Sequence, residues 1–286
     1  MKQYLFYLKL SVFFVFFGRA YQFFFFGAPF RALLWDESLL TPIVEGFFNM
    51  SWQDYATSAA VNNSIESFTK FGAFIFLLGA LLSLFWERIK FEVLKRTIII
   101  LGTLLLVIIG ICLTKEKSYD PLQFFELSIQ IAAPIALLFS GDLEASNKKS
   151  TLLWLKIAIA LTFIPHGLFA MGLIYVPGHF IDLTISILKV TETQAKYFLF
   201  TVGFLDVVAS VLIFLPKLSK YAFMYIIVWG FLTAFARVIV GVNSHFFLST
   251  LHNSAFLTIY RIPHGLLPLA TFTLFKITNN HQNIIK

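Results

Sequence analysis

Long apolar runs separated by short polar connections dominate the pattern along this chain. A helix needs about 20 apolar residues to cross a bilayer, and eight stretches come close to that length. They cover residues 4–26, 68–86, 97–113, 122–140, 152–175, 197–215, 221–241 and 256–275. Because the runs are continuous and do not alternate over segments of about ten residues, they indicate helices and not a transmembrane β-barrel. The predicted fold is an all-α integral membrane protein with about eight transmembrane helices.

The composition of the 286-residue chain supports this class of protein. Hydrophobic residues make up 58% of the chain and charged residues 13%, whereas soluble domains are about half apolar and a quarter charged. The mean hydropathy is +0.82, which excludes a water-soluble globule and a disordered chain. The net charge of +7 therefore does not indicate a nucleic-acid partner, and membrane lipid is the expected partner. With Cys112 as its single cysteine, the chain has no internal disulfide.

Lysine and arginine are distributed unevenly between the two sides that these helices define. With the N-terminus inside, the inner segments are the two termini and the connections 87–96, 141–150 and 216–220. They carry eleven such residues, namely Lys2, Arg88, Lys90, Lys95, Arg96, Lys148, Lys149, Lys217, Lys220, Lys276 and Lys286. The longer outer segments carry five, namely Arg31, Lys115, Lys117, Lys189 and Lys196. Because positive residues favour the cytoplasmic side, both termini are predicted to be cytoplasmic, in a bacterial-type inner (plasma) membrane.

The first apolar run has a second interpretation. Lys2, an apolar run to Phe17 and the small residues Gly18 and Ala20 also fit a cleaved signal peptide. Hydrophobicity resumes at 23–26, so cleavage would leave an apolar N-terminus exposed. Retention as the first helix is therefore the favoured interpretation.

The chain divides into two halves with a similar order of features. Residues 1–150 hold four predicted helices and a long outer segment at 27–67, and residues 151–286 hold four more with outer segments at 176–196 and 242–255. In each half a proline-marked outer segment follows the first helix and leads into a glycine-bearing helix. Since an even number of helices separates the two occurrences, the pattern favours two parallel four-helix repeats. Chance similarity among apolar helices is the alternative.

The outer segments are themselves partly apolar. Ile181, Ile185 and Leu188 recur at helical spacing, which predicts an interfacial helix lying on the outer surface of the membrane. The stretch 32–66 is interrupted by polar residues in the same way. An ordinary structured loop is the alternative for both segments.

Polar side chains within the predicted spans gather at one depth, in the outer half of the membrane. Such residues are costly to bury and mark a site by default. Six helices contribute them, and the set is Arg19, Gln22, Glu126, Gln130, His166, Asp206, Arg237, Tyr260, Arg261 and His264. As alternatives, Arg19 and Arg261 can extend to the outer interface, and Glu126 can simply end a helix. Asp206 can form a structural ion pair with Arg237.

The tetrapeptide Ile-Pro-His-Gly occurs twice, at 164–167 and 262–265. Proline kinks a helix and frees a backbone acceptor, and glycine allows another helix or a ligand to approach closely. A neutral histidine both donates and accepts a hydrogen bond, and neighbouring carboxylates stabilise its charged form. The two copies therefore predict a protonatable pair, His166 and His264, with two structural histidines on kinked helices as the alternative.

Neither haem nor a metal ion is the favoured cofactor of this layer. Each of the two histidines directly follows a proline, and no surrounding pattern typical of haem ligation is present. A closed metal site would need further ligands such as Glu126 or Asp206. His179, His245 and His252 lie in outer segments and are interpreted as solvated or interfacial rather than as metal ligands.

The charge of the layer indicates its ligand. Three arginines against Glu126 and Asp206 make a mildly positive pocket, which suits an anion, a lipid headgroup or a quinone carbonyl. The leading hypothesis is a quinone or small anion bound in a redox-linked process. His166 and His264 would exchange protons or bind a carbonyl, the arginines would stabilise negative charge, and the two carboxylates would tune the histidines.

Two other functions use the same features. A transporter or lipid-handling protein would use the layer as a substrate site between repeats. A non-catalytic subunit of a larger complex would use the phenylalanine-rich faces and outer segments to bind other membrane or periplasmic subunits.

The second half resembles a known family. The segment 163–172, FIPHGLFAMG, is similar to the first-helix motif of DoxX-like membrane proteins, in which an HG pair precedes an outer segment. Val202-Gly203 and Leu205-Asp206 resemble that family's second helix. The likeness covers about 155–240, and it implies that the first half is a diverged copy in which Arg19 replaces the histidine. The resemblance implies four-helix bundles, some of them linked to quinone-coupled sulfur oxidation or to membrane redox complexes.

Overall fold

The computed structural model describes residues 1–140 and 145–284, and helices make up most of both ranges. In order they are α1 (Lys2–Phe25), α2 (Arg31–Leu34), α3 (Glu37–Gly46), α4 (Trp52–Thr57), α5 (Ala59–Leu84), α6 (Glu92–Glu116), α7 (Leu122–Phe125), α8 (Ser128–Leu138), α9 (Ala145–Met171), α10 (Gly178–Leu188), α11 (Glu192–Leu212), α12 (Ser219–Gly241), the 3₁₀ helix η2 (Ser244–Phe246), α13 (Phe247–Ile259) and α14 (Pro263–Ile284). The inner connection predicted at 141–150 lies partly outside the described residues.

Six of the described helices are long and apolar enough to cross a membrane. They are α1, α5, α6, α9 from Lys148 onward, α11 and α12. The predicted class, an all-α multi-pass membrane protein, is therefore confirmed. The other two predicted runs, 122–140 and 256–275, correspond to helices that are each divided in two, α7–α8 and α13–α14.

The backbone N–H groups at the two breaks are accounted for in different ways. Pro263 is the first residue of α14, a position where a missing N–H leaves no donor unpaired. At the start of α8, the amide of Ile129 donates to the Thr162 hydroxyl of α9 at 3.0 Å. Thr162 therefore supplies an acceptor that the interrupted helix lacks.

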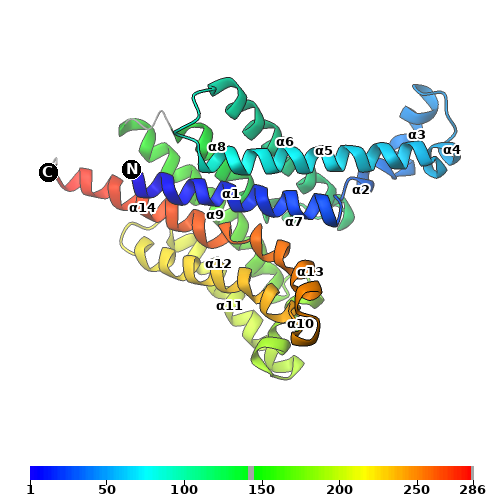
Figure 1. The fold of residues 1–286 in the computed structure, drawn as a ribbon. Helices are drawn as coiled ribbons and strands as arrows, with labels where there is room; N and C mark the ends of the chain where they lie inside the picture. Colours follow the sequence, from blue (N-terminus) through cyan, green and yellow to red (C-terminus); the bar gives the residue numbers. More distant parts are fainter. Residues whose placement is uncertain (141–144, 285–286) are drawn as a thin grey trace.

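The helices form one bundle with both described ends on the same side, and the short helices α2, α3, α4, α10 and α13 lie toward the other end (Figure 1). Helix α1 packs against α5, α8 and α14, and α9 packs against α11, α8 and α14. The segment predicted at 176–196 contains the helix α10, and 242–255 contains η2 and most of α13. The helical spacing of Ile181, Ile185 and Leu188 is confirmed, since all three lie in α10.

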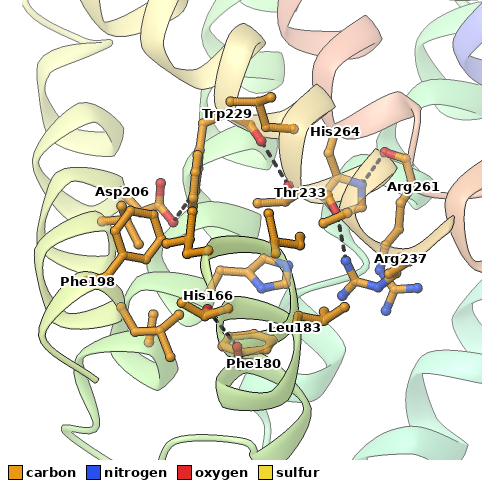
Figure 2. Close-up of a pocket in the computed structure, with 18 of the residues that line it drawn as sticks. His166, Phe180, Leu183, Phe198, Asp206, Trp229, Thr233, Arg237, Arg261 and His264 are labelled. Atoms are coloured by element: carbon orange, nitrogen blue, oxygen red, sulfur yellow. Dashed lines mark hydrogen bonds between the residues drawn. The ribbon is translucent and has the colours of Figure 1, made fainter. Parts of the chain in front are cut away.

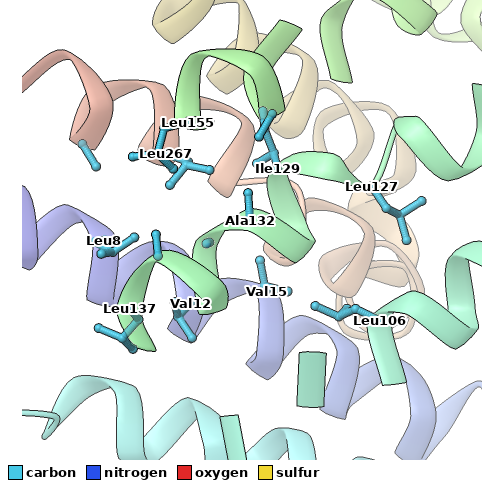
Figure 3. Close-up of a cluster of buried hydrophobic side chains, with 14 of the residues drawn as sticks. Leu8, Val12, Val15, Leu106, Leu127, Ile129, Ala132, Leu137, Leu155 and Leu267 are labelled. Carbon is cyan, nitrogen blue, oxygen red and sulfur yellow. The ribbon is translucent and has the colours of Figure 1, made fainter. Parts of the chain in front are cut away.

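The centre of the bundle is apolar (Figure 3). Fully buried side chains meet there from α1, α6, α8, α9 and α14, and they include Leu8, Val12, Val15, Leu106, Ile129, Leu137, Leu155 and Leu267. In a bilayer such contacts act through close packing, because lipid tails are as apolar as the side chains. The polar layer begins directly beside this core, since Arg19 lies one turn beyond Val15 and Gln130 follows Ile129.

Two glycines bring helices into backbone contact beside the polar layer. A Cβ on Gly18 would lie 2.5 Å from the Tyr260 backbone nitrogen, and a Cβ on Gly230 would lie 2.3 Å from the His264 carbonyl oxygen. Both clashes are with backbone atoms, which cannot move aside as a flexible side chain can. These contacts hold Tyr260 and His264 close to α1 and α12.

We expect Gly18→Ala to lower the free energy of unfolding by about 1–3 kcal/mol, because the added methyl overpacks a backbone contact. Thermal unfolding of the purified protein in detergent measures the change. Gly46→Ala is the matched control, since no atom lies within 4 Å of a Cβ at that position. Equal midpoints for the two variants would contradict the prediction.

Candidate functional site

Two adjacent cavities lie between the helices, beside α10 and the break between α13 and α14. The first, called here the polar cavity, has a volume of about 400 Å³. The second, the apolar cavity, has a volume of about 360 Å³ and is shown in Figure 2. Both volumes lie within the range of about 300–1,000 Å³ that is usual for ligand sites. Five residues line both cavities: His166, Phe180, Arg237, Arg261 and His264.

The predicted site residues come together in this region. The polar cavity is lined by Arg19, Gln22, Glu126, Gln130, His166, Arg237, Tyr260, Arg261 and His264. Asp206 lines the apolar cavity instead. Helices far apart in the sequence therefore deliver these side chains to one place.

Arg19 is the most completely enclosed of the three arginines, with 4% of its surface exposed. Its Nε and Nη2 atoms donate to Gln130 Oε1 at 3.1 and 2.7 Å, and Nη1 donates to Gln22 Oε1 at 2.7 Å. Its guanidinium carbon lies 4.1 Å from the centre of the Tyr260 ring. The guanidinium is thus held inside the bundle, so the alternative in which Arg19 extends to the outer interface is wrong.

Arg237 and Arg261 are bound mainly by uncharged oxygen atoms. Arg237 Nη1 donates to the Thr233 carbonyl at 2.8 Å. Arg261 Nη1 donates to the Tyr260 hydroxyl at 2.6 Å and to the Leu257 carbonyl at 3.3 Å. Because Tyr260 also contacts Arg19 through its ring, it joins two of the cations.

The alternative in which Asp206 forms a structural ion pair with Arg237 is wrong. Asp206 accepts hydrogen bonds from the Tyr225 hydroxyl at 2.9 Å and from Trp229 Nε1 at 3.3 Å. Both donors lie on α12, whereas Asp206 lies on α11. The carboxylate is satisfied there and makes no ion pair within the described residues, so it does not tune the histidines through a direct bond.

The two histidines lie beside each other and have different partners. His166 Nδ1 lies 3.5 Å from Glu126 Oε1, and the centres of the His166 and His264 rings are 5.9 Å apart. His264 Nδ1 lies 2.9 Å from the Arg261 carbonyl oxygen. A carbonyl can only accept, so Nδ1 carries the proton and Nε2 is free to accept one.

The two Ile-Pro-His-Gly copies have different backbone settings. Pro165 lies inside α9, which continues to Met171, whereas Pro263 begins α14 after a break. Glu126 directly follows α7, as the end-of-helix alternative expected, and it also contacts His166. The common tetrapeptide thus predicts the position of each histidine but not the path of its helix.

Residues that the sequence interpretation missed also line the polar cavity. Lys117, Gln123, Tyr175 and His179 line it. Partial burial, together with the charges of Arg237 and Arg261, lowers the pKa of His179 to about 4, so its imidazole is neutral at pH 7. The proline and glycine before His179 were the available signal, because Pro177 and Gly178 mark the start of α10.

The charge of the polar cavity is more positive than the sequence predicted. Its lining has the three arginines and Lys117 against the single carboxylate of Glu126, because Asp206 lies in the neighbouring cavity. The described residues contain no cluster of three or more histidine, cysteine, aspartate and glutamate side chains that could hold a metal ion. The arrangement is suited to binding and neutralising an anion.

No protein family, curated protein or solved structure that was compared matches this chain. The resemblance to DoxX-like proteins therefore stays a prediction.

We expect Gln130→Leu to destabilise the protein by about 1.5–3 kcal/mol, because it removes the acceptor of two hydrogen bonds from a buried charge. Thermal unfolding in detergent measures the loss. In a double-mutant cycle, Arg19→Met should offset part of it, since no charge is then left without its acceptor. Additive losses in the double variant would contradict this coupling.

Proposed function

We propose that the polar cavity binds an anionic group in the outer half of a bacterial-type inner membrane. One observation carries the proposal: Arg19, Arg237 and Arg261 share this cavity, and none has a carboxylate oxygen within 4.0 Å in the part of the chain that the structure describes. Buried charges are costly unless they are paired. A bound anion would supply the missing counter-charge through strong, charge-assisted hydrogen bonds.

Groups that can exchange protons stand beside these cations. Glu126 and His166 are 3.5 Å apart, and His264 offers Nε2 as an acceptor because its Nδ1 is used by a backbone carbonyl. A ligand held by the arginines would therefore meet proton donors and acceptors on the same wall. This supports an acid–base role for His166 and His264, with Glu126 positioned to tune His166.

A quinone bound in a redox-linked process is the second candidate. The adjacent imidazoles favour it, because His166 and His264 line both cavities. His166 can donate to a carbonyl oxygen and His264 Nε2 can accept from a quinol hydroxyl, while the ring and tail occupy apolar space. Asp206 would then take part only through the Tyr225 and Trp229 side chains that it binds.

For the membrane arrangement we propose eight spans with both termini in the cytoplasm. The uneven distribution of lysine and arginine supports this orientation, and so does the position of both described ends on one side of the bundle (Figure 1). In this orientation the cavities lie near the outer leaflet. Neither cavity is lined by residues from the inner connections 87–96 or 216–220, which favours binding from the outer side over a transport path.

We also propose that the two halves are parallel copies of a four-helix unit. The packing supports a pseudo-twofold relation: α1 contacts α8 and α14, and α9 contacts α14 and α8. The fourth helix is broken in both halves, and each copy has a proline inside its second piece, Pro134 in α8 and Pro268 in α14.

The site residues follow the same relation. Gln130 lies four residues before Pro134 as His264 does before Pro268, and Glu126 and Tyr260 each lie eight residues before the same prolines. Within the halves, Arg19 binds Gln130 and His166 contacts His264. Between the halves, Arg19 contacts Tyr260 and His166 contacts Glu126. Four contacts thus form two matching pairs, which supports duplication over chance similarity.

We expect Arg237→Gln to weaken the binding of inorganic phosphate by about tenfold or more, since a charge-assisted hydrogen bond is lost. Isothermal titration calorimetry on the detergent-purified protein measures the affinity. Arg96→Gln is the matched control, because Arg96 is exposed at the inner end of α6, where it pairs with Glu92. Phosphate affinities unaffected by Arg237→Gln would contradict the anion site.

For the quinone, we expect the protein purified in native lipid to carry the cofactor, detected by mass spectrometry and by its absorption spectrum. His166→Ala with His264→Ala should then reduce the amount retained, because both hydrogen-bonding imidazoles are gone. Lipid extracts without quinone, together with unchanged spectra in the double variant, would remove this candidate.

A further inference from the structure

We propose that the polar and apolar cavities form one continuous site for a phosphate-bearing lipid, with the headgroup among the arginines and the hydrocarbon chain between α10, α11 and α12. This inference rests on the proposed anion site and extends it to the part of the molecule that carries the chain. Four observations support it: a shared wall, the composition of the apolar cavity, its opening and the order of charges along the two cavities.

The shared wall makes the two cavities neighbours along one path. Arg237, Arg261, His166 and His264 line both. Figure 2 shows the imidazoles between the arginines on one side and the interior of the apolar cavity on the other. A headgroup that contacts these arginines therefore has its attached chain beside the entrance to apolar space.

The apolar cavity has the lining that a hydrocarbon chain requires. Leu183 and Ile187 come from α10, Leu199 and Val202 from α11, and Leu232 and Ala236 from α12. Its polar members lie mainly at the shared wall, or are already bonded to neighbours, as Asp206 is. Close packing rather than expulsion from water would select the chain, because the chain leaves lipid when it enters.

The apolar cavity also opens at the apolar surface of the bundle. Leu232 and Ile239 line it while 56% and 65% of their surfaces are exposed, and Ile187 on α10 is 40% exposed. These residues form its rim on α12 and α10. A molecule dissolved in the bilayer can enter sideways at this rim, whereas the polar cavity is lined by Lys117, which directly follows α6, and by Gln123 of α7.

The positions of the charged residues around the apolar cavity determine the orientation of the bound lipid. Asp206 stands at one side of the apolar cavity, and Arg237 and Arg261 stand at the opposite side (Figure 2). An anionic headgroup is repelled by the carboxylate and attracted by the guanidiniums. The chain therefore points toward Asp206 and Trp229, and an inverted pose is disfavoured.

The test compares a single-chain lipid phosphate, lysophosphatidate, with inorganic phosphate and with an uncharged monoacylglycerol of the same chain. Binding is measured by native mass spectrometry and by thermal shift in an uncharged maltoside detergent, which carries no phosphate. Lysophosphatidate should stabilise the unaltered protein at a concentration roughly tenfold lower than phosphate requires, and the uncharged lipid should not compete. A shorter-chain lysophosphatidate, compared at equal mole fraction, should bind more weakly.

Two variants of α12 separate the chain site from the headgroup site. Ala236→Phe fills the apolar cavity and should remove the advantage of lysophosphatidate while leaving phosphate affinity within about twofold. Val228→Phe is the matched control, because Val228 is exposed on the same helix and does not line either cavity. Val228→Phe should bind both ligands as the unaltered protein does.

The two proposals fail in different ways. If phosphate binds, but lysophosphatidate has no advantage and chain length has no effect in the unaltered protein, the lipid inference is overturned and the anion site stands. If neither phosphate nor lysophosphatidate stabilises the unaltered protein, both proposals fail. The chain-length comparison needs no variant, so a folding defect in Ala236→Phe would not leave the inference untested.

Discussion

The cost of burying a guanidinium governs the part of the bundle that holds the polar cavity. Arg19 offsets this cost through hydrogen bonds to two amide oxygens and through contact with the face of the Tyr260 ring. Two features allow Tyr260 to occupy this position. The chain breaks between α13 and α14, and Gly18 leaves room for the Tyr260 backbone. The break, the glycine and the buried Gln130 therefore act together to compensate for the hydration that Arg19 loses on burial.

Separation of opposite charges is the second organising feature. Asp206 is buried, at 3% exposure, yet it is satisfied by Tyr225 and Trp229 and not by an arginine. If Asp206 paired with Arg237, the polar cavity would lose much of its positive potential. Keeping the carboxylate on neutral donors leaves the guanidiniums available to a ligand, which is the electrostatic basis of the proposed function.

The position of a residue along a helix can be predicted from sequence, whereas the direction in which its side chain points around the helix axis cannot. Counting from the helix ends predicted that side chains from six helices share one layer, and Arg19, His166 and His264 do line one cavity. The same counting grouped Asp206 with the arginines, but Asp206 lines the neighbouring cavity and binds side chains of α12, because its partners depend on how α11 is rotated against α12. The division of 122–140 near Glu126 has no proline or glycine at the break to indicate it. Lys117 and His179 reach the cavity from connections outside the predicted spans, where counting along a span assigns no depth.

The wall that the two cavities share has a consequence for how the protein responds to its surroundings. His166, His264, Arg237 and Arg261 cannot be reoriented for one cavity without altering the other. Solutes arriving from water and molecules arriving from the bilayer would thus be linked thermodynamically, each changing the other's affinity by the same factor. Through this one set of side chains, the affinity for a ligand from water would depend on what is bound from the bilayer, and the reverse.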